Sequence, residues 1–400
     1  SGVISLFEGQ SRWDREVAPD LKYFTNFAVI NIPSEAHFGD DLEEPYESWV
    51  NYGTNIARDV HIKARQVQNM GVIDAVASLK VEAEDLILQD GKLLAGQSLL
   101  LKARNLKMRS QTNTVGAELI LDVSGVLTDG GAGAEVIFET QRGIRLERKP
   151  AWGDLLGTEI RASVADFESQ RLHWPAEDRG ANVAGFRDNA ALGRLILSKA
   201  NLSKFVFGGE AGQNNAIYID FLEIKGVTEQ QIVEGGLPQV DIEDGYAVYF
   251  AASNVPAELI DGMYDGRLRW VNEFPGDYSS MPLYLAPLDK TIRVNRSFRQ
   301  SILFDTDDDG TANGFDLTPF GGGLPDITAV TLADGNKVAL EWMGIPGSLY
   351  RIEYKDDVEQ ARWQLLKEHF YDGLIVKRIT HTDLLSRKTA RRFYRVVFVE

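Results

Sequence analysis

Apolar side chains recur along this chain with a period of about twenty residues, and within each repeat they alternate with polar ones. In four consecutive segments, three apolar residues stand two positions apart and a fourth follows three positions later; the segments begin 19, 20 and 20 residues apart. Alternation with a period of two indicates β-strands, and a repeat of this length predicts a parallel β-solenoid whose turns bury their apolar faces against one another. The segments are Val60-x-Ile62-x-Ala64-x-x-Val67, Leu79-x-Val81-x-Ala83-x-x-Leu86, Leu99-x-Leu101-x-Ala103-x-x-Leu106 and Leu119-x-Leu121-x-Val123-x-x-Val126.

Most positions beside these apolar residues are polar, which favours a solenoid with an aliphatic interior and a solvated outer face. An amphipathic helix would need apolar residues three or four positions apart, so the spacing of two argues against it. Charges interrupt every repeat, which argues against amyloid-like stacking of separate chains. The polar positions are occupied by His61, Lys63, Lys80, Glu82, Lys102, Glu118 and Asp122.

The pattern predicts an all-β protein in which a right-handed parallel β-helix is followed by a small β-region and a C-terminal β-sandwich. Short alternating strands at roughly ten-residue spacing are typical of an immunoglobulin-like or fibronectin III-like sandwich. The expected regions are an N-terminal segment with a candidate joining strand (1–45), the β-helix with an insertion near 150–190 (46–227), a β-rich middle region of antiparallel-like strands (228–300), a calcium loop and linker (301–323) and the sandwich (324–400).

Two stretches resemble known families. The repeated motif Leu-x-Leu-x-Ala-x-x-Leu, with glycine-bearing turns, resembles the filamentous haemagglutinin type of β-helix over about residues 25–225. Trp342, Tyr350, Trp363 and Arg392-Phe-Tyr-Arg395 look like a C-terminal domain common in surface proteins of the Verrucomicrobia and Planctomycetes. These resemblances imply an exported bacterial protein, adhesive and located outside the cell or on its surface.

Composition narrows the classes of partner. The 400 residues include 59 Asp and Glu against 42 Lys and Arg, a formal charge of −17, which argues against nucleic acid and anionic lipid as partners. No apolar run approaches the roughly 20 residues that span a bilayer, so we expect no membrane insertion. Cys is absent, which excludes disulfides and thiolate metal sites. The chain begins with Ser1-Gly2 rather than Met, which favours a processed form whose signal peptide has been removed.

One local motif carries metal chemistry. The segment from Asp305 to Asp316 resembles the loops of dockerins and thrombospondin type 3 repeats, with acids at positions 1, 3, 5 and 12 and glycine at position 6. Carboxylates held about 4 Å apart repel one another by roughly 1 kcal/mol in water and about 4 near a protein surface, so an ordered loop of this kind favours a cation. The predicted cofactor is calcium, and its candidate ligands are Asp305, Asp307, Asp309, Thr311 and Asp316.

Catalytic motifs are absent from the sequence. The five histidines lack metal-ligand spacing, and no nucleophile elbow, phosphate loop or dinucleotide fingerprint occurs. We therefore expect no enzyme and assign no catalytic residue. A glycan-cleaving β-helix is an alternative, in which acids on adjacent turns act together, and Trp152, Trp174 and Tyr218 are candidates for stacking on sugars. The acids of that alternative are Glu82, Glu84, Asp85, Glu118, Asp122 and Asp188.

The ends of a solenoid carry unpaired backbone groups, which must be covered or joined to another chain. Head-to-tail joining of copies generates a filament. The sequence therefore predicts a secreted structural protein that assembles with copies of itself into an extracellular or cell-surface filament stiffened by calcium, with residues 1–30 and 392–399 as candidate joining strands. The alternatives are a monomeric surface adhesin or carbohydrate-binding protein and, third, a β-helix polysaccharide lyase or hydrolase.

Replacing Asp305 with Ala should lower the melting temperature in calcium, because the first ligand is lost at the junction of the middle and C-terminal regions. Scanning calorimetry with calcium and with a chelator measures the effect. Equal thermal stability in the two conditions would contradict the calcium site.

Overall fold

The computed structural model divides into two compact units. The first comprises Ser1–Val255 with Leu259–Tyr278, and the second comprises Pro256–Glu258 with Ser279–Glu400. The residues that the structure describes are 3–5, 11–13, 22–39, 45–131, 133–199, 202–209, 214–285, 290–295, 303, 327–333, 337–344, 348–357, 360, 362–372, 377–385 and 391–399.

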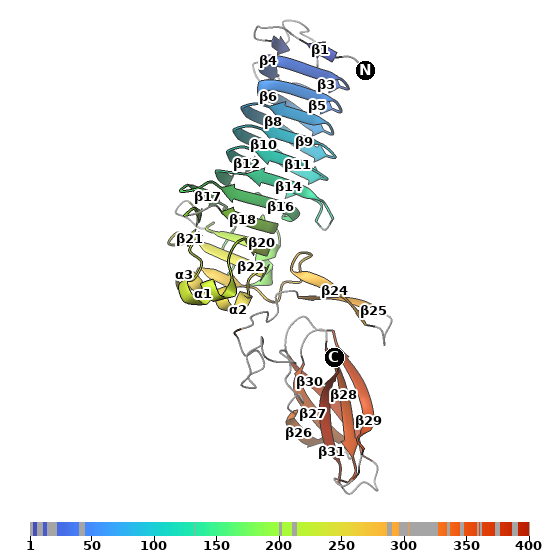
Figure 1. The fold of residues 1–400 in the computed structure, drawn as a ribbon. Helices are drawn as coiled ribbons and strands as arrows, with labels where there is room; N and C mark the ends of the chain where they lie inside the picture. Colours follow the sequence, from blue (N-terminus) through green and yellow to red (C-terminus); the bar gives the residue numbers. More distant parts are fainter. Residues whose placement is uncertain are drawn as a thin grey trace. The chain divides into compact units, whose positions relative to one another are not determined.

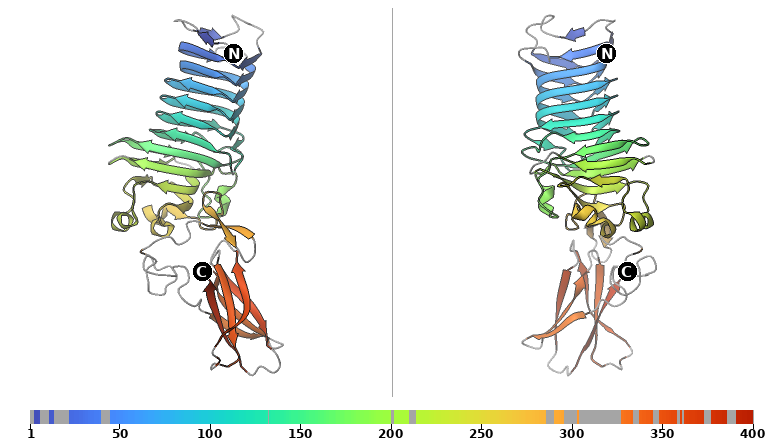
Figure 2. Two further views of the ribbon diagram at one scale, coloured as in Figure 1. Left: turned by 45° about the vertical axis from the view of Figure 1, so that its right-hand side comes forward. Right: turned by 90° about the vertical axis from the view of Figure 1, so that its left-hand side faces the viewer.

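The first unit is a parallel β-solenoid of about 11 turns, as the repeat predicted. The strands of successive turns lie one above another (Figure 1), and the same stacking is visible from two further sides (Figure 2). The strands are β1 (Val3–Ser5), β2 (Ser11–Trp13), β3 (Tyr23–Asn26), β4 (Val29–Phe38), β5 (Tyr46–Asn51), β6 (Thr54–Asn69), β7 (Val72–Ala75), β8 (Ser78–Gln89), β9 (Lys92–Ala95), β10 (Ser98–Arg109), β11 (Thr112–Val115), β12 (Glu118–Val123), β13 (Leu127–Thr128), β14 (Val136–Thr140), β15 (Gly143–Leu146), β16 (Leu155–Val164), β17 (Ser169–His173), β18 (Leu192–Lys199), β19 (Lys204–Gly208), β20 (Ala216–Ile224), β21 (Val240–Ile242), β22 (Ala247–Ser253) and β23 (Leu268–Trp270). The helices are η1 (Val183–Phe186), α1 (Glu229–Gly235), α2 (Ala257–Ile260) and α3 (Met263–Gly266).

An aliphatic column runs through the interior of the solenoid. Ile62, Val81, Leu101 and Leu121 are direct partners in the parallel pairs β6–β8, β8–β10 and β10–β12, and each is at most 1% exposed. Burying such a side chain contributes about 1.5–3 kcal/mol, so the column favours one register between turns. A second column, of buried side chains, consists of Ala36, Val60, Leu79, Leu99, Leu119, Ile144, Leu172, Phe207 and Ile242.

Glycines stand where the corners of successive turns come closest together. A Cβ added at Gly71 would lie 2.0 Å from the carbonyl oxygen of Gly53, and a Cβ added at Gly116 would lie 2.0 Å from that of Gly96. No side chain fits such a distance, so the stacked corners require glycine at these positions.

The corner that contains Gly53 and Gly71 also contains a ladder of buried amides. Asn26 donates from Nδ2 to Oδ1 of Asn51 over 3.0 Å, and Asn51 donates in the same way to Asn69 over 2.8 Å. Nδ2 of Asn69 donates to the carbonyl oxygen of Gly71 over 3.1 Å. Because an unpaired buried amide is costly, these bonds also disfavour a shift of one turn against the next.

The solenoid extends beyond the expected limits of 46–227. At the N-terminus, β1 and β2 pair in parallel with β4, and β3 pairs with β5. After residue 228, β21, β22 and β23 also join the parallel stack, so the antiparallel middle region predicted from 228 is wrong as far as Trp270. Within the expected insertion at 150–190, β16 and β17 continue the stack.

β22 escaped sequence analysis because both faces of this strand are buried, as they are in β20. In β22 every residue from Val248 to Ser253 is buried, so the apolar residues run together instead of alternating. The chain between β17 and β18 covers the outer face: Phe186 packs edge-on against Tyr218 at 5.4 Å and stacks on Phe274 at 3.9 Å.

Asp154 holds this covering segment in place by accepting hydrogen bonds from the backbone N–H groups of Asp188, Asn189 and Ala191 over 2.7–3.0 Å. Burial raises the pKa of the Asp154 carboxyl, and these three donors oppose the rise.

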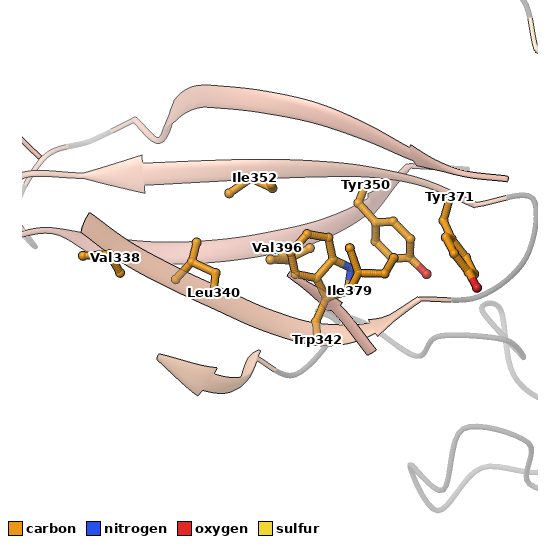
Figure 3. Close-up of a cluster of buried hydrophobic side chains, with 8 residues drawn as sticks. All are labelled: Val338, Leu340, Trp342, Tyr350, Ile352, Tyr371, Ile379 and Val396. Carbon is orange, nitrogen blue, oxygen red and sulfur yellow. The ribbon is translucent and has the colours of Figure 1, made fainter. Parts of the chain in front are cut away.

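The second unit contains small antiparallel sheets, which confirms the predicted fold class of its C-terminal part. Two three-stranded sheets, β26–β27–β30 and β29–β28–β31, enclose one cluster of buried side chains that includes Trp342 and Tyr350, with ring centroids 5.8 Å apart (Figure 3). The strands of this unit are β24 (Ser280–Leu285) and β25 (Lys290–Asn295), which form an antiparallel pair, and β26 (Ile327–Ala333), β27 (Lys337–Gly344), β28 (Ser348–Lys355), β29 (Gln364–Tyr371), β30 (Lys377–Leu384) and β31 (Phe393–Val399).

Gly71→Ala should lower the free energy of unfolding by about 1–3 kcal/mol, because the new methyl group would collide with the backbone of the preceding turn. Gly235→Ala is the matched control, since a Cβ at this helical position has no heavy atom within 4 Å. It should stabilise the protein by roughly 0.5–1 kcal/mol. Urea unfolding of both variants tests this difference, and equal stability would contradict the close stacking of the corners.

Candidate functional site

A groove of about 560 Å³ lies on the outside of the solenoid, across β6, β8, β10 and β12. We call it the charged groove. Its lining residues are Pro45, Lys63, Ala64, Arg65, Glu82, Ala83, Glu84, Lys102, Ala103, Arg104, Asp122, Ser124 and Arg148.

The groove follows from a bend in the long strands. The ladder of paired residues on β6 includes Lys63 and Ala64, omits the next residue and resumes at Gln66. β8 and β10 have the same gap at the corresponding position. Alanines at the bend leave little side-chain volume, so Ala64, Ala83 and Ala103 form a shallow floor between two rows of charged side chains.

The acids of the groove are paired with bases along the stack. Glu82 lies 3.3 Å from Nζ of Lys80 and 3.8 Å from Nζ of Lys102, while Asp122 lies 2.7 Å from Nε of Arg148. Two of the three acids sit deep, with Glu82 24% and Asp122 14% exposed, whereas Glu84 is 56% and Lys102 54% exposed. Glu84 and Lys102 therefore both meet solvent.

The lining contains five bases and three acids, although acids outnumber bases in the chain as a whole. The groove is thus locally basic on an acidic protein. Its carboxylates can accept hydrogen bonds, and its Lys and Arg side chains can bind anions. This combination suits a ligand that carries both hydroxyl and anionic groups.

A second hollow, of about 540 Å³, lies further along the solenoid and shares β12 with the charged groove. Its charged lining side chains are Glu118, Arg142, Arg145, Arg171 and His173. Two of the arginines are already engaged: Arg171 makes a bidentate pair with Glu243 at 2.5 and 2.8 Å, and Arg145 donates to Glu147 over 3.0 Å. Bases of the charged groove are also paired with acids, but that groove crosses four successive strands and contains five bases, so we consider it first.

The acids proposed for the enzyme alternative are placed in structural interactions. Asp85 accepts a hydrogen bond from Nδ2 of Asn105 over 2.8 Å, and Asp188 accepts one from the backbone N–H of Gly153 over 3.1 Å. Glu84 pairs with Arg104 at 3.7 Å, Glu82 and Asp122 are held in the groove as described, and Glu118 lines the second hollow. Three of these acids, Glu82, Glu84 and Asp122, form ion pairs with bases, and the enzyme alternative stays a prediction.

Two of the three aromatic residues proposed to stack on sugars are in the interior. Trp174 is 1% exposed and donates from Nε1 to the carbonyl oxygen of Ala190, and Tyr218 is fully buried. That role is therefore wrong for both, while Trp152 is 64% exposed. The sequence analysis missed an exposed pair, Phe27 and Tyr52, whose rings stack at 4.9 Å on a corner of the first turns.

The candidate calcium ligands Asp305, Asp307, Asp309, Thr311 and Asp316 lie outside the described residues, so calcium binding stays a prediction. Within the part of the chain that the structure describes, no group of three or more His, Asp or Glu side chains is placed to hold a metal ion. No helix among the described residues is both long and apolar enough to cross a membrane.

The groove bases were visible in the sequence but were treated only as a solvated face. Their distinguishing signal is that the sign of charge changes from one repeat to the next at the same position, as at Lys63, Glu82, Lys102 and Asp122.

Comparison of the chain with family models, curated proteins and solved structures finds no match. The resemblances noted from the sequence therefore rest on their motifs alone.

Glu82→Lys should destabilise the solenoid by about 1–2 kcal/mol at low salt, because Lys63, Lys80 and Lys102 would surround a fourth positive charge. Most of this loss should disappear in 1 M salt, where the Debye length is about 3 Å. Asp166→Lys, at an exposed turn, is the control. Urea unfolding at both salt concentrations measures the effect, and a loss independent of salt would contradict the ionic ladder.

Proposed function

We propose that this protein is an exported, surface-located scaffold that binds acidic glycans in the charged groove of its solenoid. The observation that carries the proposal is the excess of bases over acids in one long hollow of a chain with a net charge of −17. A locally basic groove on an acidic protein attracts anionic ligands to that part of the surface.

The rigidity of the solenoid supports this role. The buried aliphatic columns and the amide ladder fix each turn against the next, so the side chains of the groove stay at regular intervals. This rigidity reduces the entropy lost when a long ligand binds. An extracellular or cell-surface location agrees with this ligand class and with the adhesin-like motif of the repeats.

Assembly into a homopolymeric filament is the second candidate. It is favoured by β3, whose described ladder partner is β5 alone, and by the exposed ring of Tyr23 on that strand. At the other end, β22 is followed by β23 and α3, and all residues from Val248 to Ser253 are buried. Because this end is covered, simple stacking of the last turn of one copy on the first turn of the next is disfavoured. We therefore rank the filament below glycan binding.

Lys102→Ala with Arg104→Ala should weaken binding of an acidic polysaccharide about tenfold or more, since two exposed bases of the groove are removed. The control is Lys107→Ala with Arg109→Ala, which removes the same charge from the same strand outside the groove. Isothermal titration calorimetry with hyaluronan at low salt measures both.

Equal weakening in the two double variants would contradict a groove site and indicate non-specific charge attraction. Absence of binding by the wild-type protein to hyaluronan and to polygalacturonate would reject glycan binding. Electron microscopy of the same preparation tests the filament, and short monodisperse particles would reject that candidate.

A further inference from the structure

The charges that line the charged groove alternate in sign along the solenoid, a feature that the proposed function does not use. Each of the first three turns contributes two charged side chains of one sign, and the sign reverses from one of these turns to the next. β6 contributes Lys63 and Arg65, β8 contributes Glu82 and Glu84, and β10 contributes Lys102 and Arg104. Asp122 in β12 continues the alternation in the first row, whereas Ser124 follows Arg104 in the second.

The strand register sets the repeat distance of this pattern. Lys63, Glu82, Lys102 and Asp122 are successive partners in parallel ladders. Neighbouring strands in a sheet lie about 4.8 Å apart, so like charges recur about every 10 Å along the solenoid axis. A ligand lying along this axis meets basic and acidic turns alternately.

Other linear polymers fit this pattern less well. In an extended peptide, side chains on one face recur about every 6.7 Å, out of step with the groove. Single-stranded nucleic acid carries a charge on every nucleotide and relies on aromatic side chains for base stacking, and none of the described lining residues is aromatic. In an extended polysaccharide, each sugar advances the chain by about the width of one turn of the solenoid.

We propose that the groove selects a linear polysaccharide with a carboxylate on every second sugar. This inference rests on the proposed function and adds to it the spacing of the ligand's charges. Lys63 with Arg65 and Lys102 with Arg104 bind the carboxylates of alternate sugars. Glu82, Glu84 and Asp122 accept hydrogen bonds from the hydroxyl groups of the uncharged sugars between them.

The acidic turns therefore determine which acidic polysaccharides the groove binds. A polymer with a carboxylate on every sugar would place alternate carboxylates against Glu82 and Glu84, and like charges brought together exclude the wrong ligand. Glu84 is 56% exposed, so its charge reaches the ligand as well as the neighbouring Arg104.

The test compares hyaluronan, which has a carboxylate on every second sugar, with polygalacturonate, which has one on every sugar, and with neutral dextran. Calorimetry on the full chain should show binding to hyaluronan about tenfold tighter than to polygalacturonate. Glu82→Gln with Glu84→Gln should abolish this preference by strengthening binding to polygalacturonate. The matched control, Glu229→Gln with Glu234→Gln on α1, should retain it.

Equal affinity for the two acidic polymers, or preference for polygalacturonate, would overturn the spacing inference while leaving glycan binding intact. A preference that persists in the Glu82→Gln, Glu84→Gln variant would also overturn it. Failure to bind either polymer would reject the proposed function itself, and with it this inference.

Discussion

Stacking of the turns in one register is the constraint on which the rest of the solenoid depends. The columns through Ile62, Val81, Leu101 and Leu121 exist only if each strand meets its equivalent in the next turn. Because side chains alternate between the two faces of a strand, a slip of one residue would move these aliphatic groups into water and bring charges inside. Glycine corners and the asparagine ladder reinforce the same register, since both depend on matching positions in adjacent turns.

The register also organises the outer face. Every outward position becomes part of a row along the axis, so a change of charge from repeat to repeat becomes an alternation in space. Ion pairs such as Glu82 with Lys102 and Asp122 with Arg148 then link neighbouring turns. Each exposed pair contributes little to stability, about 0–1 kcal/mol. The charged rows therefore add little to the stability of the fold. Their regular spacing is a property that a ligand can recognise.

The sequence predicted the solenoid because its central turns bury one face and expose the other, which leaves a clear alternation around Val81 and Leu101. It failed at β16 and β17, which it assigned to an insertion, and at β21 to β23, which it placed in an antiparallel region. In this part of the solenoid both faces of a strand can be buried, as in β22, so apolar residues need not alternate with polar ones. The charged groove was not predicted, although the sequence marks the bend on which its floor depends. The last apolar residue of each repeat follows three positions after Ala64, Ala83 or Ala103 instead of two. This spacing shows where a strand bends but not that a hollow forms there.

The register of the turns is tested most directly by engineered disulfides, since the chain contains no cysteine of its own. Lys80 and Leu100 are partners in adjacent turns, and Ile120 is the partner of Leu100 one turn further. Cysteines can bridge when their Cα atoms are about 4.4–6.8 Å apart but not beyond about 7 Å. Mild oxidation should therefore cross-link Lys80→Cys with Leu100→Cys, and leave Lys80→Cys with Ile120→Cys reduced. The reverse result, or no cross-link in the first pair, would contradict the in-register solenoid.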